Sequence, residues 1–429
     1  MKILLIAPNT IRATRKKAFI VPFPQASLTT IAGLTPSEHS IEIIDERLHD
    51  INYDGDYDLI GITVMTATSS RAYLIADEFR NRKKKVVLGG IHPSALPEEA
   101  IQHADSVVIG EAEGLWELVL KDVQAGQLKP FYKREELPCL AGLPPARLDL
   151  LGRGYLLKNV FQTTRGCPHN CGFCSVSTFN GRKYRHRPVD EIIAEVSRCH
   201  SKMIGFLDDN IVGNPKYSKE LFRALIPLKK RWVSQGTVKM AEDEELIDLA
   251  QKCGCISLFV GFESVNEKNL KEMHKHFNPI QKYQKLIENF HRHHIMVVGS
   301  FVFGFDDDEP SVFSETLKFI EETKIDFATF NILTPLPGTE VFEKFKKEGR
   351  IFTYDWSLYD FSHVVYHPAK MTPEELQLGH NELYRKFYII PNILKRSVWN
   401  WRYVGYFLPA SLYYNWVARH PHQLLGVND

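Results

Sequence analysis

The stretch that decides the fold is Thr163–Cys174, TTRGCPHNCGFC, in a chain of 429 residues. Its three cysteines, Cys167, Cys171 and Cys174, follow the spacing C-x3-C-x2-C. Thiolates this close repel one another and oxidise easily, so they are stable mainly when a metal neutralises their charge. Gly166, directly before the first cysteine, allows the backbone to wrap a compact inorganic centre. The stretch therefore predicts a metal-binding loop.

Two kinds of metal centre are compatible with three cysteines. Zinc takes four tetrahedral ligands, and the nearest candidates for the fourth are His169 and His186. An iron–sulfur cluster held by three cysteines keeps one iron open, and an open metal position is where substrate chemistry takes place. The total of seven cysteines is odd, which argues against a disulfide framework. The remaining four are expected to be ordinary thiols: Cys139, Cys199, Cys253 and Cys255.

The sequence around the loop alternates between strand and helix patterns. Asn159–Thr164 reads as a strand that leads into the cysteines, and units of about 25 to 40 residues follow it, as in parallel sheets with helical crossovers. The six expected strands predict a partial (β/α)6 barrel of the TIM type, whose ligands bind at the carboxyl ends of the strands. The expected strands after the loop are Met203–Leu207, Thr237–Met240, Ile256–Gly261, Met296–Phe303 and Phe327–Leu333.

The first 130 residues show a second α/β pattern. A helix over Ser69–Arg82 has its apolar residues on one face, as in a doubly wound, Rossmann-like sheet whose ligand crevice lies beyond the strand ends. Gly89 and Gly90, after the fourth strand, would let the backbone approach a ligand closely. The expected strands are Lys2–Ala7, Ile41–Asp45, Leu59–Val64, Lys85–Leu88 and Ser106–Ile109.

These patterns predict four segments: an α/β domain over 1–130, a proline-rich linker over 131–154, the barrel over 155–350 and a helical, aromatic-rich extension over 351–429. In the extension, Thr372 and Glu375 form a capping-box pattern for a helix that ends near Phe387. Aromatic and basic residues then interleave as far as Val417. This part could close the barrel mouth against water, dock at a membrane interface or bind a protein partner.

Composition limits the function classes. Basic residues number 53 and acidic residues 52, a net charge of +1, so no basic footprint for DNA or bulk RNA is present. Met1–Pro8 is too short for a secretory signal. The apolar run Ile295–Phe305 falls short of the roughly 20 residues that span a bilayer. We expect a cytoplasmic protein, with peripheral membrane contact through the C-terminal segment as an alternative.

At the cysteine loop the sequence resembles the radical S-adenosylmethionine (SAM) superfamily. Arg165–Gly166 before the first cysteine and Phe173 before the last fit that family's pattern. The resemblance implies that Cys167, Cys171 and Cys174 bind a four-iron four-sulfur cluster whose open iron chelates SAM. Reductive cleavage of SAM then yields a 5′-deoxyadenosyl radical, with the electron supplied by a donor such as flavodoxin or ferredoxin.

The same resemblance implies contacts to SAM or substrate at the ends of the later barrel strands. Each of these residues also has an ordinary structural interpretation, as a helix cap or a solvated turn. The positions are Asp208, Lys239, Glu263, Ser264, Gly304 and, in the segment expected near the adenine, Pro335. No catalytic acid or base stands out.

The front domain resembles the cobalamin-binding domain that precedes the barrel in many radical SAM enzymes. Three of the matching pieces are Ile62–Thr66, Val86–Ile101 and Val107–Glu113. Domains that ligate cobalt through histidine carry D-x-H-x-x-G after the first strand, whereas this chain reads APNTIR over Ala7–Arg12, so any bound cobalamin would lack that ligand. The alternative is an empty domain kept for packing. The expected contacts are Thr63, Thr66, Gly89, Gly90 and His92.

Together the two resemblances predict a cobalamin-dependent C-methyltransferase that acts on an unactivated carbon of a small or lipid-like molecule. A radical enzyme without methyl transfer, such as a cyclase, a ring-contraction enzyme or a rearrangement enzyme, is the first alternative. A zinc-stabilised binding module is the alternative from another class. A tRNA-modifying radical enzyme is disfavoured by the neutral charge.

Overall fold

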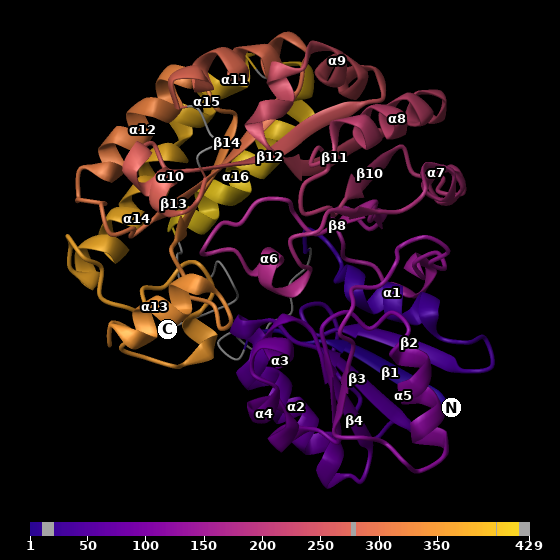
Figure 1. The fold of residues 1–429 in the computed structure, drawn as a ribbon. Helices are drawn as coiled ribbons and strands as arrows, with labels where there is room; N and C mark the ends of the chain where they lie inside the picture. The colour runs from indigo at the N-terminus through magenta and orange to yellow at the C-terminus, as the bar shows by residue number, and fades with distance from the viewer. Residues whose placement is uncertain (11–20, 276–279, 400, 420–429) are drawn as a thin grey trace. The chain divides into compact units, whose positions relative to one another are not determined.

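The computed structural model describes residues 1–10, 21–275, 280–399 and 401–419 (Figure 1). The chain forms two compact units. The first consists of Met1–Pro168, Cys174–Asp209 and Leu336–Thr339. The second consists of His169–Phe173, Asn210–Pro335 and Glu340–Asp429. The first unit therefore contains the front sheet and also the elements that flank the cysteine loop.

The front sheet has six parallel strands in the order β2-β1-β3-β4-β5-β6. Five of them agree with the expected strands to within one residue, and the sixth lies in the stretch expected to be a linker. Their bounds are β1 Lys2–Ala7, β2 Ser40–Asp45, β3 Leu59–Thr63, β4 Lys85–Gly89, β5 Ser106–Ile109 and β6 Phe131–Lys133.

Helices cover both faces of this sheet, which is why β1 is apolar along its length. Leu4 and Ile6 pack in one buried cluster with residues of α2 (Ser69–Asn81), whereas Ile3 and Leu5 pack in another with residues of α1 (Ala26–Leu34) and α5 (Trp116–Gln124). Figure 1 shows α2 and α5 on opposite sides of the strands. The two faces of one strand thus hold the three layers together. Shorter helices, α3 (Ile91–Ala95), α4 (Pro97–Ala100), η1 (Thr66–Thr68), η2 (Ile101–His103) and η3 (Leu148–Leu150), complete this part.

The first unit continues through the elements on either side of the cysteine loop. β7 (Val160–Phe161) pairs in parallel with β10 (Met203–Phe206). β8 (Thr164–Arg165) pairs antiparallel with β9 (Arg185–His186), so that Arg165 stands opposite Arg185. This hairpin, which the sequence did not predict, closes the base of the cysteine loop. The helices here are α6 (Ser175–Phe179) and α7 (Val189–Ser197).

In the second unit four parallel strands, β11 to β14, follow one another in sheet order. Together with β7 and β10 they give the six strands, alternating with helices, that the sequence predicts. Their bounds are β11 Arg231–Gly236, β12 Cys255–Glu263, β13 Met296–Phe303 and β14 Phe327–Ile332. The helices are α8 (Pro215–Leu225), η4 (Ile226–Leu228), α9 (Glu244–Lys252), α10 (Glu267–Glu272), η6 (Ile280–Lys282), α11 (Tyr283–Arg292), α12 (Val312–Thr323), α13 (Glu340–Lys347) and η7 (Trp356–Leu358).

One strand was placed wrongly. The sequence predicts a strand over Thr237–Met240, but the strand is β11, Arg231–Gly236, and the 3-10 helix η5 (Val238–Glu242) follows it. Val238 and Met240 are buried from that helix, so their apolar character does not mark a strand.

The C-terminal extension is helical, as predicted: α14 (Pro373–Phe387), α15 (Ile390–Trp399), η8 (Trp401–Tyr403) and α16 (Val404–Arg419). The capping box of α14 is confirmed, with Thr372 and Glu375 bonding reciprocally at 3.1 and 2.8 Å. Phe407 of α16 packs against Phe327 at a centroid distance of 4.8 Å, so one side of this helix is attached to β14. Within the described residues, no helix has the length and apolar character needed to cross a membrane.

Candidate functional site

A cavity of about 310 Å³ lies at the carboxyl edge of the front sheet. The ends of three strands contribute Thr63, Gly89 and Gly110, and the start of α1 contributes Ser27 and Leu28. In open parallel sheets ligands bind in this crevice beyond the strand ends. Most of the other lining residues are aliphatic, as is typical of a site for a large organic cofactor.

Gly90, which lines the cavity, lies in a turn that only glycine can make. Its φ angle is +109°, and a Cβ atom at this position would lie 2.7 Å from the carbonyl oxygen of Val64. A residue with a side chain would therefore be strained and would collide with the backbone. Gly90 is therefore required by the turn itself, and the predicted approach of this backbone to a ligand stays a prediction.

The predicted cobalamin contacts divide into two groups. Thr63, Gly89 and Gly90 line the cavity, and Thr63 Oγ1 lies 3.1 Å from Ser27 Oγ. Thr66 and His92 are buried and are not among the lining residues; His92 Nε2 lies 3.1 Å from Glu99 Oε1. The structure gives no support to direct contact from these two side chains. The lining contributed by the described residues contains no histidine.

The cavity has one polar wall. It is formed by Glu111 and Glu113, which follow β5, and by Gln162, Arg165 and Asn180 from either side of the cysteine loop. Arg165 Nη1 donates to Glu111 Oε2 at 2.8 Å, and Arg165 Nη2 lies 2.5 Å from Glu113 Oε1. Burial lowers the pKa of Arg165, but the two carboxylates outweigh it and raise this pKa, so the guanidinium stays charged.

The cysteine loop supplies the donors for a metal cluster. Cys167, Cys171 and Cys174 are half-buried, and all three are outside disulfide bonds. Gly166 has φ +81°, and a Cβ atom there would lie 2.6 Å from the Lys183 carbonyl oxygen, so the turn into the loop requires glycine. Among the described residues, no group of three His, Cys, Asp or Glu side chains is arranged as a ready-made ion site. Three half-buried thiols outside disulfide bonds are the donor set that an iron–sulfur cluster with one open iron takes, so these residues fit such a cluster by their chemistry.

Asp208 and Asp209 anchor the strand that leads into this loop. Asp208 is fully buried; it accepts hydrogen bonds from the backbone N–H groups of Thr163 and Thr164 and from the Thr163 hydroxyl, at 2.6 to 2.8 Å. Asp209 Oδ2 accepts from Gly166 N–H at 2.9 Å. Burial raises the pKa of Asp208 to about 6. Asp208 was expected to face SAM, but both of its oxygens hold the strand instead.

In the second unit, charged groups surround His169 of the cysteine loop. Glu263 ends β12 with φ +64° and pairs with the buried Lys275, whose Nζ lies 2.5 Å from Glu263 Oε1. Burial, together with the positive charges of Lys275 and Lys239, lowers the pKa of His169 to about 4. Lys239 itself is exposed and lies in η5 instead of at a strand end. The Glu263–Lys275 pair thus presents one charge of each sign near the end of β12.

The other predicted barrel residues are held by the protein itself. Ser264 Oγ accepts from Asn266 N–H at 3.0 Å, in a turn that also involves Asn269. Gly304 has φ +100°, and its missing side chain makes room for Tyr366, whose hydroxyl donates to the Gly304 carbonyl at 2.6 Å. In this chain Gly304 is therefore needed for packing, whatever it does toward SAM. Pro335 is buried at the end of the segment after β14.

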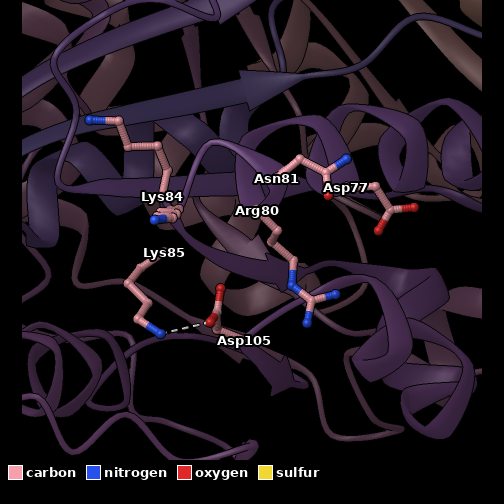
Figure 2. A pocket seen from close by; sticks show the side chains of 7 residues that line it. Asp77, Arg80, Asn81, Lys84, Lys85 and Asp105 are labelled. Carbon is pink, nitrogen blue, oxygen red and sulfur yellow. Dashed lines mark hydrogen bonds and ion pairs between the residues drawn. The ribbon is translucent and has the colours of Figure 1, made fainter.

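A second hollow carries no site chemistry. It is lined by charged surface residues around the end of α2 and the start of β4, the opposite strand end from the cavity (Figure 2). Lys85 pairs there with Asp105 at 2.8 Å. These charges are solvated and partly neutralise one another, so this hollow is not a candidate binding site.

Comparison with known proteins identifies the family. The model of the radical SAM superfamily matches residues 161–320, and the model of the B12 binding domain matches residues 30–120. The chain is 34% identical, over 92% of its own length and 89% of the other's, to bacteriochlorophyllide d C-12(1)-methyltransferase of Chlorobaculum tepidum. The chain belongs to the radical SAM superfamily.

Further relatives agree with this membership. The bacteriochlorophyllide d C-8(2)-methyltransferase of Chlorobaculum tepidum is also 34% identical, with 88% of each protein covered. Among solved structures, the cobalamin-dependent SAM radical enzyme OxsB with aqua-cobalamin and SAM bound has a similar fold, with a TM-score of 0.68 at 15% identity, over 100% of this chain and 73% of that one. The predicted fold class is confirmed, and the radical SAM chain is an enzyme of the methyltransferase type.

The matches also fix the cofactors by class. The superfamily uses a four-iron four-sulfur cluster with SAM, and the B12 binding domain takes cobalamin, as predicted. The alternatives of a zinc-stabilised module and of an empty packing domain are thereby set aside.

Three functionally placed residues escaped the sequence reasoning. Glu111 lies inside the matching piece Val107–Glu113 without a role of its own, and Asp209 and Lys275 are not among the expected site residues. Their partners are 54, 43 and 12 residues away along the chain, so no local pattern marks the pairs. A charged residue soon after a strand could have suggested Glu111 and Asp209, whereas Lys275 follows the helix α10 (Glu267–Glu272) and carries no such signal.

Proposed function

We propose that this chain methylates an unactivated carbon on a side chain of a tetrapyrrole. The observation that carries the proposal is the 34% identity, across nearly the whole chain, to two enzymes whose names describe methylation of bacteriochlorophyllide side chains. When bound, the cluster and SAM supply the radical, and cobalamin supplies the methyl group. An electron donor of the flavodoxin or ferredoxin class would reduce the cluster.

The residues have distinct tasks in this proposal. Cys167, Cys171 and Cys174 hold the cluster, and the cavity beyond β3 and β4 holds the corrin. The Glu263–Lys275 pair and His169 provide a polar environment for the carboxylate and amino groups of SAM, since a fixed ion pair can orient both charges of a zwitterion. Excluding water from the radical is the remaining task of the protein.

The test is anaerobic turnover with a tetrapyrrole that carries an alkyl side chain, such as bacteriochlorophyllide d. The reconstituted enzyme receives SAM, a cobalamin and a reductant, and the products are separated by mass. We expect a tetrapyrrole heavier by one methylene, together with S-adenosylhomocysteine and 5′-deoxyadenosine. The variant in which all three cysteines are alanine serves as the control and should form none of these products.

Two other outcomes would redirect the proposal. 5′-Deoxyadenosine without S-adenosylhomocysteine would indicate a radical cyclisation or rearrangement, the first alternative drawn from the sequence. S-Adenosylhomocysteine only with a non-tetrapyrrole lipid would keep the methyl transfer and reject the substrate.

We further propose that the outer faces of α15 and α16 contact an anionic lipid surface. Exposed apolar residues recur along α15, the short helix η8 and α16, among them Leu394, Val398, Trp401, Leu412 and Trp416. The sequence from 388 to 419 contains four basic residues and no acidic residue. Exposed aromatic and aliphatic side chains interleaved with cations favour the interfacial layer of a negatively charged bilayer.

Sedimentation with vesicles containing phosphatidylglycerol tests this contact. The double variant Val398→Asp and Trp401→Asp should stay in the supernatant while the wild type pellets. Leu156→Asp is the matched control, since Leu156 is as exposed as these residues, at 74%, but lies outside the extension. Equal sedimentation of wild type and double variant would reject the contact and favour a role in closing the barrel mouth.

A further inference from the structure

A buried cluster of four charges joins the cobalamin cavity to the base of the cysteine loop. Its members, Glu111, Glu113, Arg165 and Arg185, are each less than 10% exposed, and we call them the arginine–glutamate cluster. Two positive and two negative charges balance, so the cluster can be buried without a net charge. Glu111, Glu113 and Arg165 also line the cavity.

Glu111 holds the centre of this cluster. It accepts a hydrogen bond from Arg165 at 2.8 Å and one from Arg185 at 3.0 Å, and a second contact joins it to Arg185. Arg165 and Arg185 stand directly opposite each other in the β8–β9 hairpin. Like charges opposite one another in an antiparallel pair are destabilising. Because Glu111 bonds to both arginines, the charge balance of the hairpin depends on a residue from the segment that follows β5 of the front sheet.

The contacts continue from the cluster into the loop itself. Gly166, the next residue after Arg165, donates its N–H to Asp209, which also accepts from Asn180 Nδ2 at 2.9 Å. The Asn180 carbonyl in turn accepts from Arg185 Nη2 at 3.0 Å. Both ends of the cysteine loop are therefore bonded to one network, which begins at the wall of the cavity.

We propose that Glu111 is a positioning residue that fixes the base of the cysteine loop against the cavity wall. In this way Glu111 sets the distance between the cluster with its SAM, which supply the radical, and the cobalamin, which supplies the methyl group. This inference rests on the proposed methyl transfer, because only a reaction with two cofactors needs that distance to be fixed. A displacement of about 1 Å between reacting groups can lower a rate by roughly a hundredfold.

The variant Glu111→Gln tests the proposal, because it keeps the shape of the side chain and removes its charge. The matched control is Glu195→Gln: Glu195 is as exposed as Glu111, at 8%, and pairs with a single buried arginine, Arg187, at 2.7 Å. Glu195 does not line the cavity. Two measurements are made on both variants and on the wild type.

The first measurement uses the protein without cofactors. Amide exchange over residues 164–186 should be at least about tenfold faster in Glu111→Gln than in the wild type, because the two arginines then repel each other across the hairpin. Adding Arg185→Gln to this variant removes one of the two charges and should restore most of the protection. Exchange should remain at the wild-type rate in Glu195→Gln.

The second measurement is the ratio of 5′-deoxyadenosine to methylated product in the fully loaded enzyme. Counted only over enzyme molecules that hold both the cluster and cobalamin, this ratio should rise about tenfold in Glu111→Gln, since SAM is cleaved but the methyl group is delivered less often. An unchanged ratio with unchanged amide exchange would overturn the proposal. Faster exchange with an unchanged ratio would also overturn it, because the loop would then be loosened without consequence. If the wild type forms no methylated product, the proposed function fails, whereas the exchange measurement still decides the role of Glu111 in the loop.

Discussion

The two cofactor regions of this chain are built in opposite ways. The cavity assigned to cobalamin lies at the ends of parallel strands of four or five residues, and its turn at Gly90 is dictated by the backbone. The cysteine loop begins after strands of only two residues, β7 and β8, and among the described residues its side chains do not form a ready-made ion site. In the proposed assignment, cobalamin occupies a pocket that the backbone already forms, whereas the cluster is held by three thiols on a loop next to short strands.

The strongest way to break this comparison is to remove a thiol. Replacing any one of Cys167, Cys171 and Cys174 with alanine should reduce bound iron and SAM cleavage to background, since a cluster with an open iron already has the minimum number of protein ligands. Cobalamin binding should persist, because the described lining of the cavity contains no cysteine. Iron analysis and a hydroxocobalamin titration of the same preparation measure both effects. A parallel loss of cobalamin would show that the regions are not independent.

A substitution in the cavity should have the opposite result, with cobalamin binding reduced and iron content unchanged. Gly90→Val should weaken cobalamin binding by about a hundredfold or more and cost about 1 to 3 kcal/mol of folding stability, because a Cβ atom collides with Val64 at a strained φ angle. Iron content should stay at the wild-type level. Gly126→Ala is a suitable control: it also has positive φ but has open space around it. Tight cobalamin binding by Gly90→Val would show that the corrin does not use this cavity.

Substitutions of Asp208 measure how much folding stability its hydrogen bonds to the strand before the cysteine loop contribute. Asp208→Ala leaves two buried backbone N–H groups without an acceptor and should cost about 2 to 5 kcal/mol of folding stability. Asp208→Asn keeps one acceptor oxygen for these groups, and its amide can donate to the Thr163 hydroxyl, so its cost should be below about 1 kcal/mol. Urea unfolding of the two variants measures the difference. Equal losses would indicate that the charge of Asp208, and not its geometry, is what matters.

The smallest expected effect is a dependence of folding stability on pH. Burial raises the folded-state pKa of Asp208 from 3.8 to about 6, so the folded state holds this proton more tightly than the unfolded state does. The associated stability is complete below pH 3.8 and is lost as the pH rises through 6. Between pH 4 and pH 7, wild type should therefore lose on the order of 2 kcal/mol relative to Asp208→Asn. Unfolding curves for both proteins that stay parallel across this range would contradict the assignment.

The parts of the fold with strong local patterns could be read from the sequence. β1 and β13 occur at the predicted residues because their apolar runs are buried on both faces. β11 could not be read: only Trp232 and Ser234 of its six residues are buried, and the apolar residues after it belong to a 3-10 helix. The hairpin β8–β9 was missed because two-residue strands with polar side chains carry no periodic signal.

The candidate site shows the same limit. The three cysteines are marked by their spacing, and the paired glycines by their position after a strand. Asp208 was read as a ligand contact because a carboxylate at a strand end can serve a cofactor or the backbone equally well. Only its bonds to Thr163 and Thr164 distinguish the two. The Glu111–Arg165 pair depends on the fold bringing distant segments together, which no local pattern reports.

The β8–β9 hairpin has a consequence for how the cluster can be assembled. Joining the ends of a flexible segment costs conformational entropy, and this cost grows with the length of the segment. Here the antiparallel pairing of Thr164 and Arg165 with β9 already holds the two ends together before a metal binds. Iron and sulfide then need to order only side chains and the turns between them. The segment enclosed by the hairpin should consequently be exchangeable for the loop of a distant relative, and the graft should fold before it meets any metal.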